Sequence, residues 1–422
     1  MALLQAIRGM RDLLPEETAL WHAVEYSLWE LMVSYGYQEI RMPLLEKTQL
    51  FTRGIGEATD IVEKEMYTFD DRNGESVTLR PESTAQCIRA GLEHGLFYNQ
   101  TPRLWYYGPM FRYERPQKGR YRQFYQFGVE TYGIATPDID AEQILMMHRF
   151  WKQWDILSQI TLEINSLGTD VCRKAYRVAL VEYFTRYSAD LDEDSQRRLG
   201  SNPLRILDSK NESMRDLINN APKLMDFIHV EARDHFEQLR HYLDEASIAY
   251  KVNPNLVRGL DYYGLTVYEW TTTSLGAQGT VCGGGRYDNL VGLLGGPETK
   301  AVGFAVGMER LISLIQTQTK HNTAHLDAYF IPMGDKAQKS SIYIAEQIRN
   351  IAPHKTLLTH CGGGSVKSQF KKADKSGATI ALIVGDLELE NKTVTVKYLR
   401  EEKAQRTVAL THLPEIFKEM TD

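Results

Sequence analysis

The sequence predicts an α+β domain built around an antiparallel hairpin, interrupted by a helical insertion and followed by a smaller α/β domain. Three observations indicate this order. Residues 104–133 have the pattern of two long strands joined by a charged loop, and residues 170–250 are rich in helix formers and charge. After residue 326, apolar strand runs alternate with helical patterns, as they do in α/β domains.

The first expected element is a helix that begins near Pro15. Proline is favoured at the first helical position, and Glu16 and Glu17 suit the positive end of the helix dipole. Gly36 is expected to cap its C-terminus. Apolar residues recur at helical spacing between these ends: Leu20, Trp21, Val24, Leu28, Leu31 and Met32.

Short strands and the larger parts follow. Residues 37–42 have the pattern of a strand stopped by Pro43, and residues 77–80 that of a short strand after which Pro81 opens a helix. The polar stretch 317–325 is expected to be a linker. We therefore expect a main domain in two parts, 1–168 and 253–317, around a helical insertion at 169–252, and a last domain at 326–422.

Composition excludes several classes of protein. The net charge of −6 argues against simple coating of nucleic acid, although local basic patches can still bind RNA. The four cysteines form no CxxC pair, so neither a zinc site of that kind nor a disulfide framework is expected, and scattered thiols fit a reducing cytoplasm. The N-terminus lacks the apolar core of a signal peptide, and no apolar run has the length of a membrane span.

The hairpin carries the first candidate site. In QFYQFGVETY, strand alternation places Gln126, Gly128 and Glu130 on one face, where the glycine leaves room for a ligand. The preceding strand, WYYGPMFRYE, is expected to deliver Arg112 and Glu114 to a common face. The loop between the strands adds positive charge, which suits a polyphosphate because arginine can grip two oxygens at once. A solvated basic turn is the alternative.

A second candidate is GFAVGMERL at 303–311. Gly303 to Val306 has the pattern of a strand, and Gly307 opens a helix whose buried stripe is Met308, Leu311, Ile312 and Ile315. Arg310 lies in the first turn, off that stripe, from where it could reach a phosphate at the sheet. A surface arginine on an amphipathic helix is the alternative.

Together these segments resemble the three signature motifs of class II aminoacyl-tRNA synthetases. The strand ending at Pro43 resembles motif 1, FRYE with its loop and return strand resembles motif 2, and GFAVGMERL resembles motif 3. LVRGLDYYG (256–264), CGGGRYDNL (282–290) and TLRPEST (78–84) resemble segments specific to histidyl-tRNA synthetases. The resemblance runs nearly end to end, including GSVKSQFKKADKSGA in the last domain.

The resemblance implies a fold and an activity. The fold would be an α+β class II synthetase catalytic domain, an antiparallel sheet flanked by helices, with a helical insertion and a C-terminal α/β anticodon-binding domain. Motif 1 would build a homodimer. The activity would be ATP-dependent and Mg²⁺-dependent ligation of histidine to tRNA(His) through histidyl-adenylate, in the cytoplasm and without a metal-binding side-chain cluster.

The resemblance also implies roles in ATP binding. Arg112 would hold the α-phosphate, Glu114 the adenine amino group and Arg310 the γ-phosphate, and Phe124 would stack on adenine; Arg120 and Gln126 complete the expected ATP site. Arg258 would contact the α-phosphate and the substrate carboxylate, doing work that a metal does in relatives. The alternative for Arg258 is a structural ion pair with Asp261.

The chemistry of histidine agrees with a second set of residues. Glu82 and Glu130 can serve its ammonium and imidazole groups, with Ser83, Thr84 and Gln126 beside them as hydrogen-bond partners. Tyr262, Tyr263 and Tyr287 offer rings and hydroxyls to an imidazole, although half-buried sheet packing is their alternative. Glycines allow close approach of the backbone to a ligand at Gly283, Gly284 and Gly285.

Two regions are expected to bind tRNA. The motif 2 loop, with Gln117, Lys118 and Arg122, would meet the acceptor end. In the last domain Lys367, Lys371 and Lys375 fall at i, i+4 and i+8 on one expected helix and could follow a phosphate backbone. A solvated helix face is the alternative.

Two rival functions remain. A non-catalytic regulatory subunit of histidine biosynthesis keeps the class II fold but degrades the second histidine signature and lacks the anticodon-binding domain, whereas both are present here. Another class II synthetase, such as a threonyl, prolyl or glycyl enzyme, is disfavoured by LVRGLDYY.

Overall fold

The computed structural model describes residues 3–56, 59–117, 119–209, 211–276, 279–317 and 326–419. It divides into two compact units, Met1–His321 and Asn322–Asp422. The four cysteines carry free thiols, three of them buried. Within the described ranges, no helix is both long and apolar enough to cross a membrane.

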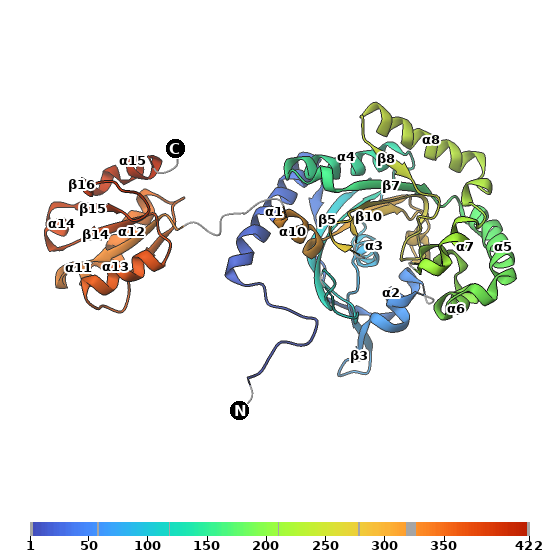
Figure 1. Ribbon diagram of the computed structural model, residues 1–422, viewed down its shortest axis with the longest axis horizontal. Helices are drawn as coiled ribbons and strands as arrows, with labels where there is room; N and C mark the ends of the chain where they lie inside the picture. Colours follow the sequence, from blue (N-terminus) through green and yellow to red (C-terminus); the bar gives the residue numbers. More distant parts are fainter. Residues whose placement is uncertain are drawn as a thin grey trace. The chain divides into compact units, whose positions relative to one another are not determined.

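The first unit is built around a mixed sheet that has eight strands in the described part of the chain (Figure 1). Its strand order is β1 (Gln38–Glu39), β5 (Arg103–Phe111), β6 (Gln123–Tyr132), β11 (Ala301–Gly307), β10 (Thr280–Arg286), β9 (Gly264–Thr271), β7 (Thr161–Ser166) and β8 (Tyr250–Val252). The outer pairs β1–β5 and β7–β8 are parallel, and all other pairs are antiparallel. A separate small sheet has the strand order β2 (Leu45–Lys47), β4 (Ser76–Leu79) and β3 (Tyr67–Asp70). Its strands come between β1 and β5 in the sequence.

Helices cover one face of the large sheet. They are α1 (Pro15–Ser34), α4 (Asp138–Gln153), α8 (Val230–Glu245) and α10 (Met308–Gln316), and their apolar side chains pack with the strand residues Phe127, Val129 and Phe304. Because side chains alternate along a strand, Gln126, Gly128 and Glu130 face the other way, as the sequence predicted. The opposite face is therefore available for a site.

Both apolar stripes predicted from helical spacing are confirmed. In α1, every residue of the predicted stripe is buried, and Gly36 follows the helix with a positive φ of 75°. In α10, Met308, Leu311, Ile312 and Ile315 are buried. These two helices follow from the sequence because an amphipathic helix against a sheet needs no information beyond its own periodicity.

Three predicted boundaries were wrong. Strand pairing near Pro43 reaches only β1, with Ile40 adding one bond to Trp105 O at 2.8 Å, because the chain then leaves the sheet edge. The helix after Pro81 begins at Thr84 rather than at the proline, because the Glu82 carboxylate accepts hydrogen bonds from the first two amide groups of the helix, those of Thr84 and Ala85. Finally, β5 ends at Phe111, one residue before Arg112.

Residues 170–245, here called the insertion, are mainly helical and share a core with the sheet, whereas residues 250–252, which were predicted to belong to the insertion, form strand β8 of the large sheet. The insertion contains α5 (Asp170–Arg186), α6 (Glu193–Ser201), the 3₁₀ helix η4 (Pro203–Asp208), α7 (Arg215–Asn219) and α8. Leu180, Phe184 and Ile206 of this segment belong to the same buried cluster as Tyr106 and Tyr287 of the main domain. Apart from α8, which covers the other face, the insertion is therefore packed on the side of the sheet that carries Tyr106 and Tyr287, together with α2 (Thr48–Ile55), α3 (Thr84–Glu93) and α9 (Leu290–Leu293).

The second unit is an α/β domain with a sheet ordered β13 (Leu357–Thr359), β12 (Ala328–Pro332), β14 (Ile380–Val384), β15 (Thr393–Tyr398) and β16 (Arg406–Ala409). The first three strands are parallel to one another, β15 is antiparallel to β14, and β16 is antiparallel to β15. Its helices are α11 (Asp335–Lys339), α12 (Ser341–Ile351), α13 (Val366–Lys375), α14 (Asp386–Asn391) and α15 (Leu413–Lys418). Buried clusters on both sides of β12 and β14 explain why these strands are apolar throughout.

Candidate active site

A cavity of about 360 Å³ lies on the face of the sheet that the four covering helices leave open. Its lining comes from β6, β10, β11, the segment after β5 and the segment before β9. It brings together most of the residues predicted from the sequence: Glu82, Thr84, Arg112, Glu114, Arg120, Phe124, Gln126, Arg258, Tyr262, Tyr263, Tyr287 and Arg310. The volume is in the range of small-molecule and cofactor sites.

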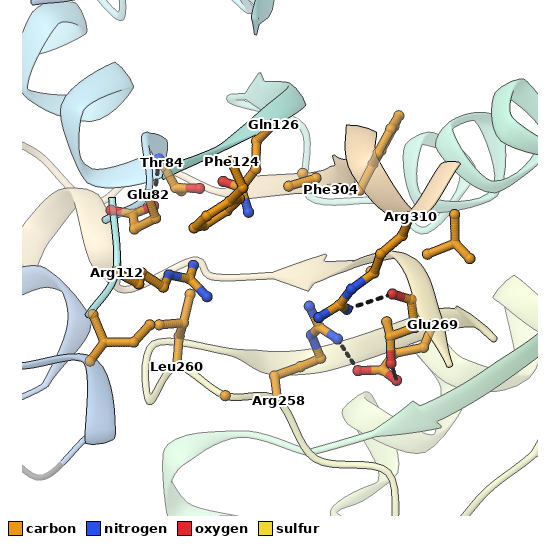
Figure 2. Close-up of a pocket in the computed structure, with 18 of the residues that line it drawn as sticks. Glu82, Thr84, Arg112, Phe124, Gln126, Arg258, Leu260, Glu269, Phe304 and Arg310 are labelled. Atoms are coloured by element: carbon orange, nitrogen blue, oxygen red, sulfur yellow. Dashed lines mark hydrogen bonds and ion pairs between the residues drawn. The ribbon is translucent and has the colours of Figure 1, made fainter. Parts of the chain in front are cut away.

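Arginine side chains converge on this cavity (Figure 2). Arg112 approaches from one side, and Arg258 and Arg310 lie close to each other on the opposite side, beside Glu269. Arg112 donates from Nε to Pro81 O at 2.9 Å, and its guanidinium carbon lies 5.2 Å from the centroid of the Phe124 ring. Although β5 ends before Arg112, the extended segment still carries both Arg112 and Glu114 to the cavity.

Arg310 reaches the cavity from the first turn of α10. It donates to Thr280 O at 2.7 Å and to Gly119 O at 3.2 Å, which ties motif 3 to β10 and to the motif 2 loop. Burial, together with the positive charges of Arg112 and Arg120, lowers the pKa of Arg310 to about 10. Burial likewise lowers the pKa of Arg112. Because these cations repel one another in a half-buried cavity, an anion bound among them would be stabilised.

Arg258 is paired with Glu269, not with Asp261 as the alternative interpretation held. Its guanidinium forms an ion pair with the Glu269 carboxylate, and both side chains are 17% exposed. Burial alone would lower the pKa of Arg258, but Glu269, Tyr263 and Tyr262 together outweigh it and raise the pKa. Asp261 instead accepts a hydrogen bond from Asn202 in the insertion, at 2.7 Å.

The Arg258 guanidinium also depends on Gly283. A Cβ atom at Gly283 would lie 2.5 Å from Nη1 of Arg258, closer than real Cβ atoms approach other atoms. The glycine was predicted to admit a ligand to the backbone, but it admits a side chain of the same protein. The same correction applies to its neighbours, because Gly284 faces Gly303 O and Gly285 faces Thr266 O.

The other end of the cavity is built around Glu130, which lies directly behind the lining. Its carboxylate accepts hydrogen bonds from Thr84 Oγ1 at 2.8 Å, from Tyr106 OH at 3.0 Å and from Tyr287 OH. The side chain is 1% exposed, and burial raises its pKa to about 8 despite the three hydroxyl donors. Gly303 on the neighbouring strand makes room for it, because a Cβ there would overlap Glu130 Oε2.

Glu82 lies near this end at the start of α3. It accepts hydrogen bonds from the Thr84 amide at 2.6 Å and from the Ala85 amide at 3.1 Å, and burial raises its pKa. Thr84 thus contacts both carboxylates. Ser83 does not line the cavity; its hydroxyl is directed to Gln86 Oε1 at 3.1 Å and to Met110 Sδ at 3.4 Å.

Three tyrosine rings form one wall. Tyr262 and Tyr263 have ring centroids 4.6 Å apart, and Tyr287 meets Tyr262 edge-on at 5.5 Å. All three are buried and line the cavity, which is compatible with both interpretations made from the sequence. Gly128 lies close by, but the Tyr106 ring fills the space beside it, which corrects the prediction that a ligand would occupy that space.

Residues of the motif 2 loop form contacts with one another. Glu114 is paired with Arg120, which also lies 3.7 Å from Glu65. Arg122 does not line the cavity; its guanidinium carbon lies 3.7 Å from the centroid of the Tyr113 ring. Gln117 forms an isolated bridge with Arg120 at the loop tip. Lys118, also predicted to contact tRNA, lies outside the described residues.

Two cavity residues escaped the sequence analysis. Glu269 lies on β9 between Tyr268 and Trp270, which are buried in the core on the opposite face, so strand alternation places it in the cavity. Tyr106 lies on β5 and reaches Glu130. Both could have been found by applying the face argument that identified Gln126 and Glu130 to the neighbouring strands.

In the second unit, α13 carries Lys367, Lys371 and Lys375, and all three side chains are exposed. Gln369 and Ala373 form the buried side of this helix. The predicted lysine row therefore lies on a solvent-facing surface, as either a phosphate contact or a solvated face requires.

Comparison with known proteins gives consistent matches over the whole chain. A family model for histidyl-tRNA synthetase matches residues 9–311, and one for an anticodon binding domain matches residues 327–420. The structure is similar to that of apo histidyl-tRNA synthetase from S. aureus, with 37% identity, a TM-score of 0.81 and coverage of 99% of this chain and 100% of that one.

Two more distant structures share the fold. A histidyl-tRNA synthetase from Nostoc is 19% identical, with a TM-score of 0.71 and complete coverage of both chains (100% each). An ATP phosphoribosyltransferase regulatory subunit/histidyl-tRNA synthetase from Bacillus halodurans is 21% identical, with a TM-score of 0.62 and coverage of 91% of this chain and 98% of that one.

Proposed function

The chain belongs to the histidyl-tRNA synthetase family, and from that premise we propose how its residues divide the work of a histidine–tRNA ligase. The enzyme joins histidine to the 3′ end of tRNA(His) in two steps, through histidyl-adenylate. The observation that carries the assignment of residues is the cavity itself, which brings Arg112, Arg258 and Arg310 together with two buried carboxyl groups, one of them (Glu82) in its lining and the other (Glu130) directly behind it.

In the first step the histidine carboxylate attacks the α-phosphorus of ATP, and pyrophosphate leaves. The nucleophile is already an anion, so the chain has no proton to remove. It must instead bring two anions together and stabilise the charge that builds on the α-phosphate. We assign this task to Arg258 and Arg112, and the γ-phosphate to Arg310. The lowered pKa values of Arg112 and Arg310 support the assignment, because a bound anion would relieve the repulsion among these cations.

We assign adenine recognition to Phe124 and Glu114, with Arg120 and Gln126 completing the ATP site. Phe124 offers a ring at the cavity wall, and Gln126 lies on the same strand, β6. The Glu114 carboxylate is paired with Arg120, so accepting an adenine amino group requires this pair to open or shift. Arg120 would then be free to meet a phosphate, which explains why both residues of the pair belong to the ATP site.

We assign histidine binding to the region of the two carboxyl groups, Glu82 and Glu130. Glu82, Thr84 and Gln126 line the cavity and offer acceptors to the ammonium group. Glu130 and the tyrosine rings receive the imidazole. Because Glu130 lies behind the lining, it would act on the imidazole by orienting the hydroxyl groups of Thr84, Tyr106 and Tyr287, which donate to it and line the cavity.

Magnesium enters with the nucleotide. The described residues contain no group of three or more His, Cys, Asp or Glu side chains placed to hold a metal ion. This donor set fits Mg²⁺, which is usually bound through one or two carboxylates and the substrate phosphates. Glu269, which lines the cavity beside Arg258, is the side chain that would add an oxygen. The ion would neutralise phosphate charge that the arginines do not reach.

The second step engages tRNA. The motif 2 loop with Gln117, Lys118 and Arg122 would meet the acceptor end, while Lys367 and Lys371 on α13 would meet the anticodon arm. We also propose a cytoplasmic, two-fold symmetric homodimer built through motif 1, which static light scattering tests directly. A mass of a single 48.3 kDa chain at working concentration would rule the dimer out.

Pyrophosphate exchange into ATP, measured with each amino acid in turn, tests the assignment. Exchange that depends on histidine alone is the expected result, followed by charging of tRNA(His). Exchange with another amino acid would assign the cavity differently. Absence of exchange with any amino acid would favour a regulatory subunit, an alternative that the match to an anticodon binding domain already disfavours.

A further inference from the structure

We propose that Arg205, on the helical insertion, is a positioning residue for adenylate formation. Its guanidinium holds the main chain of the segment 253–263, here called the Arg258 loop, which joins β8 to β9. The proposal rests on the role assigned to Arg258 above. It extends that role to a residue that does not line the active-site cavity.

Arg205 contacts the loop at Arg258 itself and at the residue that follows it. Its Nη1 donates to the carbonyl oxygen of Arg258 at 3.2 Å, and its Nη2 donates to the carbonyl oxygen of Gly259 at 3.0 Å. One rigid, planar group therefore fixes two successive peptide units. Asn202, three residues earlier, adds a third contact by donating to Asp261 Oδ1 at 2.7 Å.

The loop needs such contacts because it belongs to no helix or strand. A strand would satisfy its carbonyl groups in a ladder, whereas here the carbonyl groups of Arg258 and Gly259 accept from the insertion and that of Leu256 accepts from Asn165 on β7, at 3.0 Å. Asp261 donates its own amide to Ile55 O at 3.3 Å on the other side. Gly259 follows Arg258 directly, and glycine has more conformational freedom than other residues, so the peptide after Arg258 has little intrinsic preference of its own.

The loop also separates two cavities. On one side lies the active-site cavity, and on the other a second cavity of about 300 Å³ between the loop and the insertion. Arg258, Leu260 and Tyr263 line both. Because the second cavity replaces close packing behind Arg258, hydrogen bonds must supply the rigidity that a packed core would otherwise give.

The anchor itself is fixed. Arg205 lies in η4, whose Ile206 and Leu207 are buried in the cluster that the insertion shares with the sheet. Movement of η4 would therefore disturb that core. The chain of contacts runs from the sheet, through the buried side of η4 and the Arg205 guanidinium, to the peptide that carries Arg258.

The test compares two arginines of the insertion. Arg205→Met keeps the apolar stem and removes both donors. Arg177→Met is the matched control, because Arg177 Nη2 also donates to two main-chain carbonyls, of Gly200 at 3.2 Å and Ser201 at 2.8 Å, but these lie within the insertion. Both full-length variants are assayed by histidine-dependent pyrophosphate exchange and by amide hydrogen exchange of the loop.

For Arg205→Met we expect kcat to fall about tenfold, as for misplacement of a transition-state contact, with KM for ATP changed by less than about threefold. Amide exchange in residues 256–263 should become faster. Arg177→Met should match the parent in both. In an Arg258→Ala background, Arg205→Met should lower kcat by less than about twofold further, because it acts through a side chain that is already absent.

Each other result has one meaning. An unchanged kcat in Arg205→Met, an equal loss in Arg177→Met, or full multiplication of the effects in the double variant would each overturn the positioning role. If Arg258→Ala itself activates histidine like the parent, the proposed role of Arg258 fails instead. Should Arg205→Met fold poorly, Arg205→Lys decides: a single ammonium cannot bridge both carbonyls, so a folded variant with parental kcat also overturns the proposal.

Discussion

Replacing Glu130 with glutamine should make the first unit less sensitive to alkaline pH while impairing histidine activation. Glu130 is 1% exposed, and burial raises its pKa from 4.5 to about 8. A carboxyl group whose pKa is higher in the folded than in the unfolded chain is neutral in both at low pH. As the pH rises above 4.5 the unfolded chain gains the ionised form first, so stability is lost between pH 4.5 and pH 8.

The size of the effect follows from this shift. Each unit of pKa difference corresponds to about 1.4 kcal/mol, so the native Glu130 should lose on the order of 3 kcal/mol of unfolding free energy between pH 5 and pH 8. Glutamine has no charge to desolvate and can still accept hydrogen bonds from Thr84 and Tyr106. The Glu130→Gln variant should therefore be more stable than the parent by about that amount at pH 8, relative to its difference at pH 5.

Urea unfolding at the two pH values measures this difference. All six tryptophans lie in the first unit, so their fluorescence reports on that unit alone. Glu298→Gln, at an exposed carboxylate in the same unit, is the control and should show no pH-dependent gain. If the stability difference between Glu130→Gln and the parent is the same at pH 5 and pH 8, the burial argument is wrong. Pyrophosphate exchange should fall in the variant at both pH values, because the imidazole contact is altered.

Three further outcomes are expected. Arg258→Ala should slow single-turnover adenylate formation about 100-fold or more, with smaller changes in substrate binding, and a parental rate would contradict the assigned role. Gly283→Ala should slow the same step about tenfold or more with little loss of folding, since a Cβ would lie 2.5 Å from Arg258 Nη1; a mutant as fast as the parent would show that the guanidinium can move without consequence. A chain ending at Thr317 should still form histidyl-adenylate but charge tRNA poorly, and equal charging would show that the second unit is not an RNA anchor.

Local patterns account for what the sequence could predict. The α1 and α10 stripes and the face of β6 depend on periodicity within one element, and all three were right. The errors arose where two distant segments meet. The start of α3 depends on Glu82 as a cap, and the partner of Arg258 is Glu269 on another strand rather than the adjacent Asp261.

The glycines of CGGGRYDNL show the same limit more sharply. Sequence reasoning can say that a glycine leaves space, but only the register of β10 against its neighbours says what fills it. Gly283 faces the Arg258 side chain, while Gly284 lies opposite Phe304 and close to Gly303 O. Contacts of this kind pair residues that are 19 or more positions apart, so no short window along the chain contains both members.

The two ends of the cavity together explain why it accepts an amino acid in one orientation. Arg258 and Arg310 form an end where a bound anion would reduce the repulsion between cations, and Glu82 and Glu130 form an end where a hydrogen-bond donor or a cation would offset the burial of carboxyl groups. Arg112 lies beside Glu82, across the cavity from the other two arginines. A histidine molecule carries a carboxylate at one extremity and an ammonium and an imidazole at the others. Reversing it would bring its carboxylate to Glu82 and its ammonium to the arginines, so both ends would repel it. The orientation that remains would deliver the nucleophilic carboxylate to the end where Arg258 is proposed to hold the α-phosphate, as the first step requires.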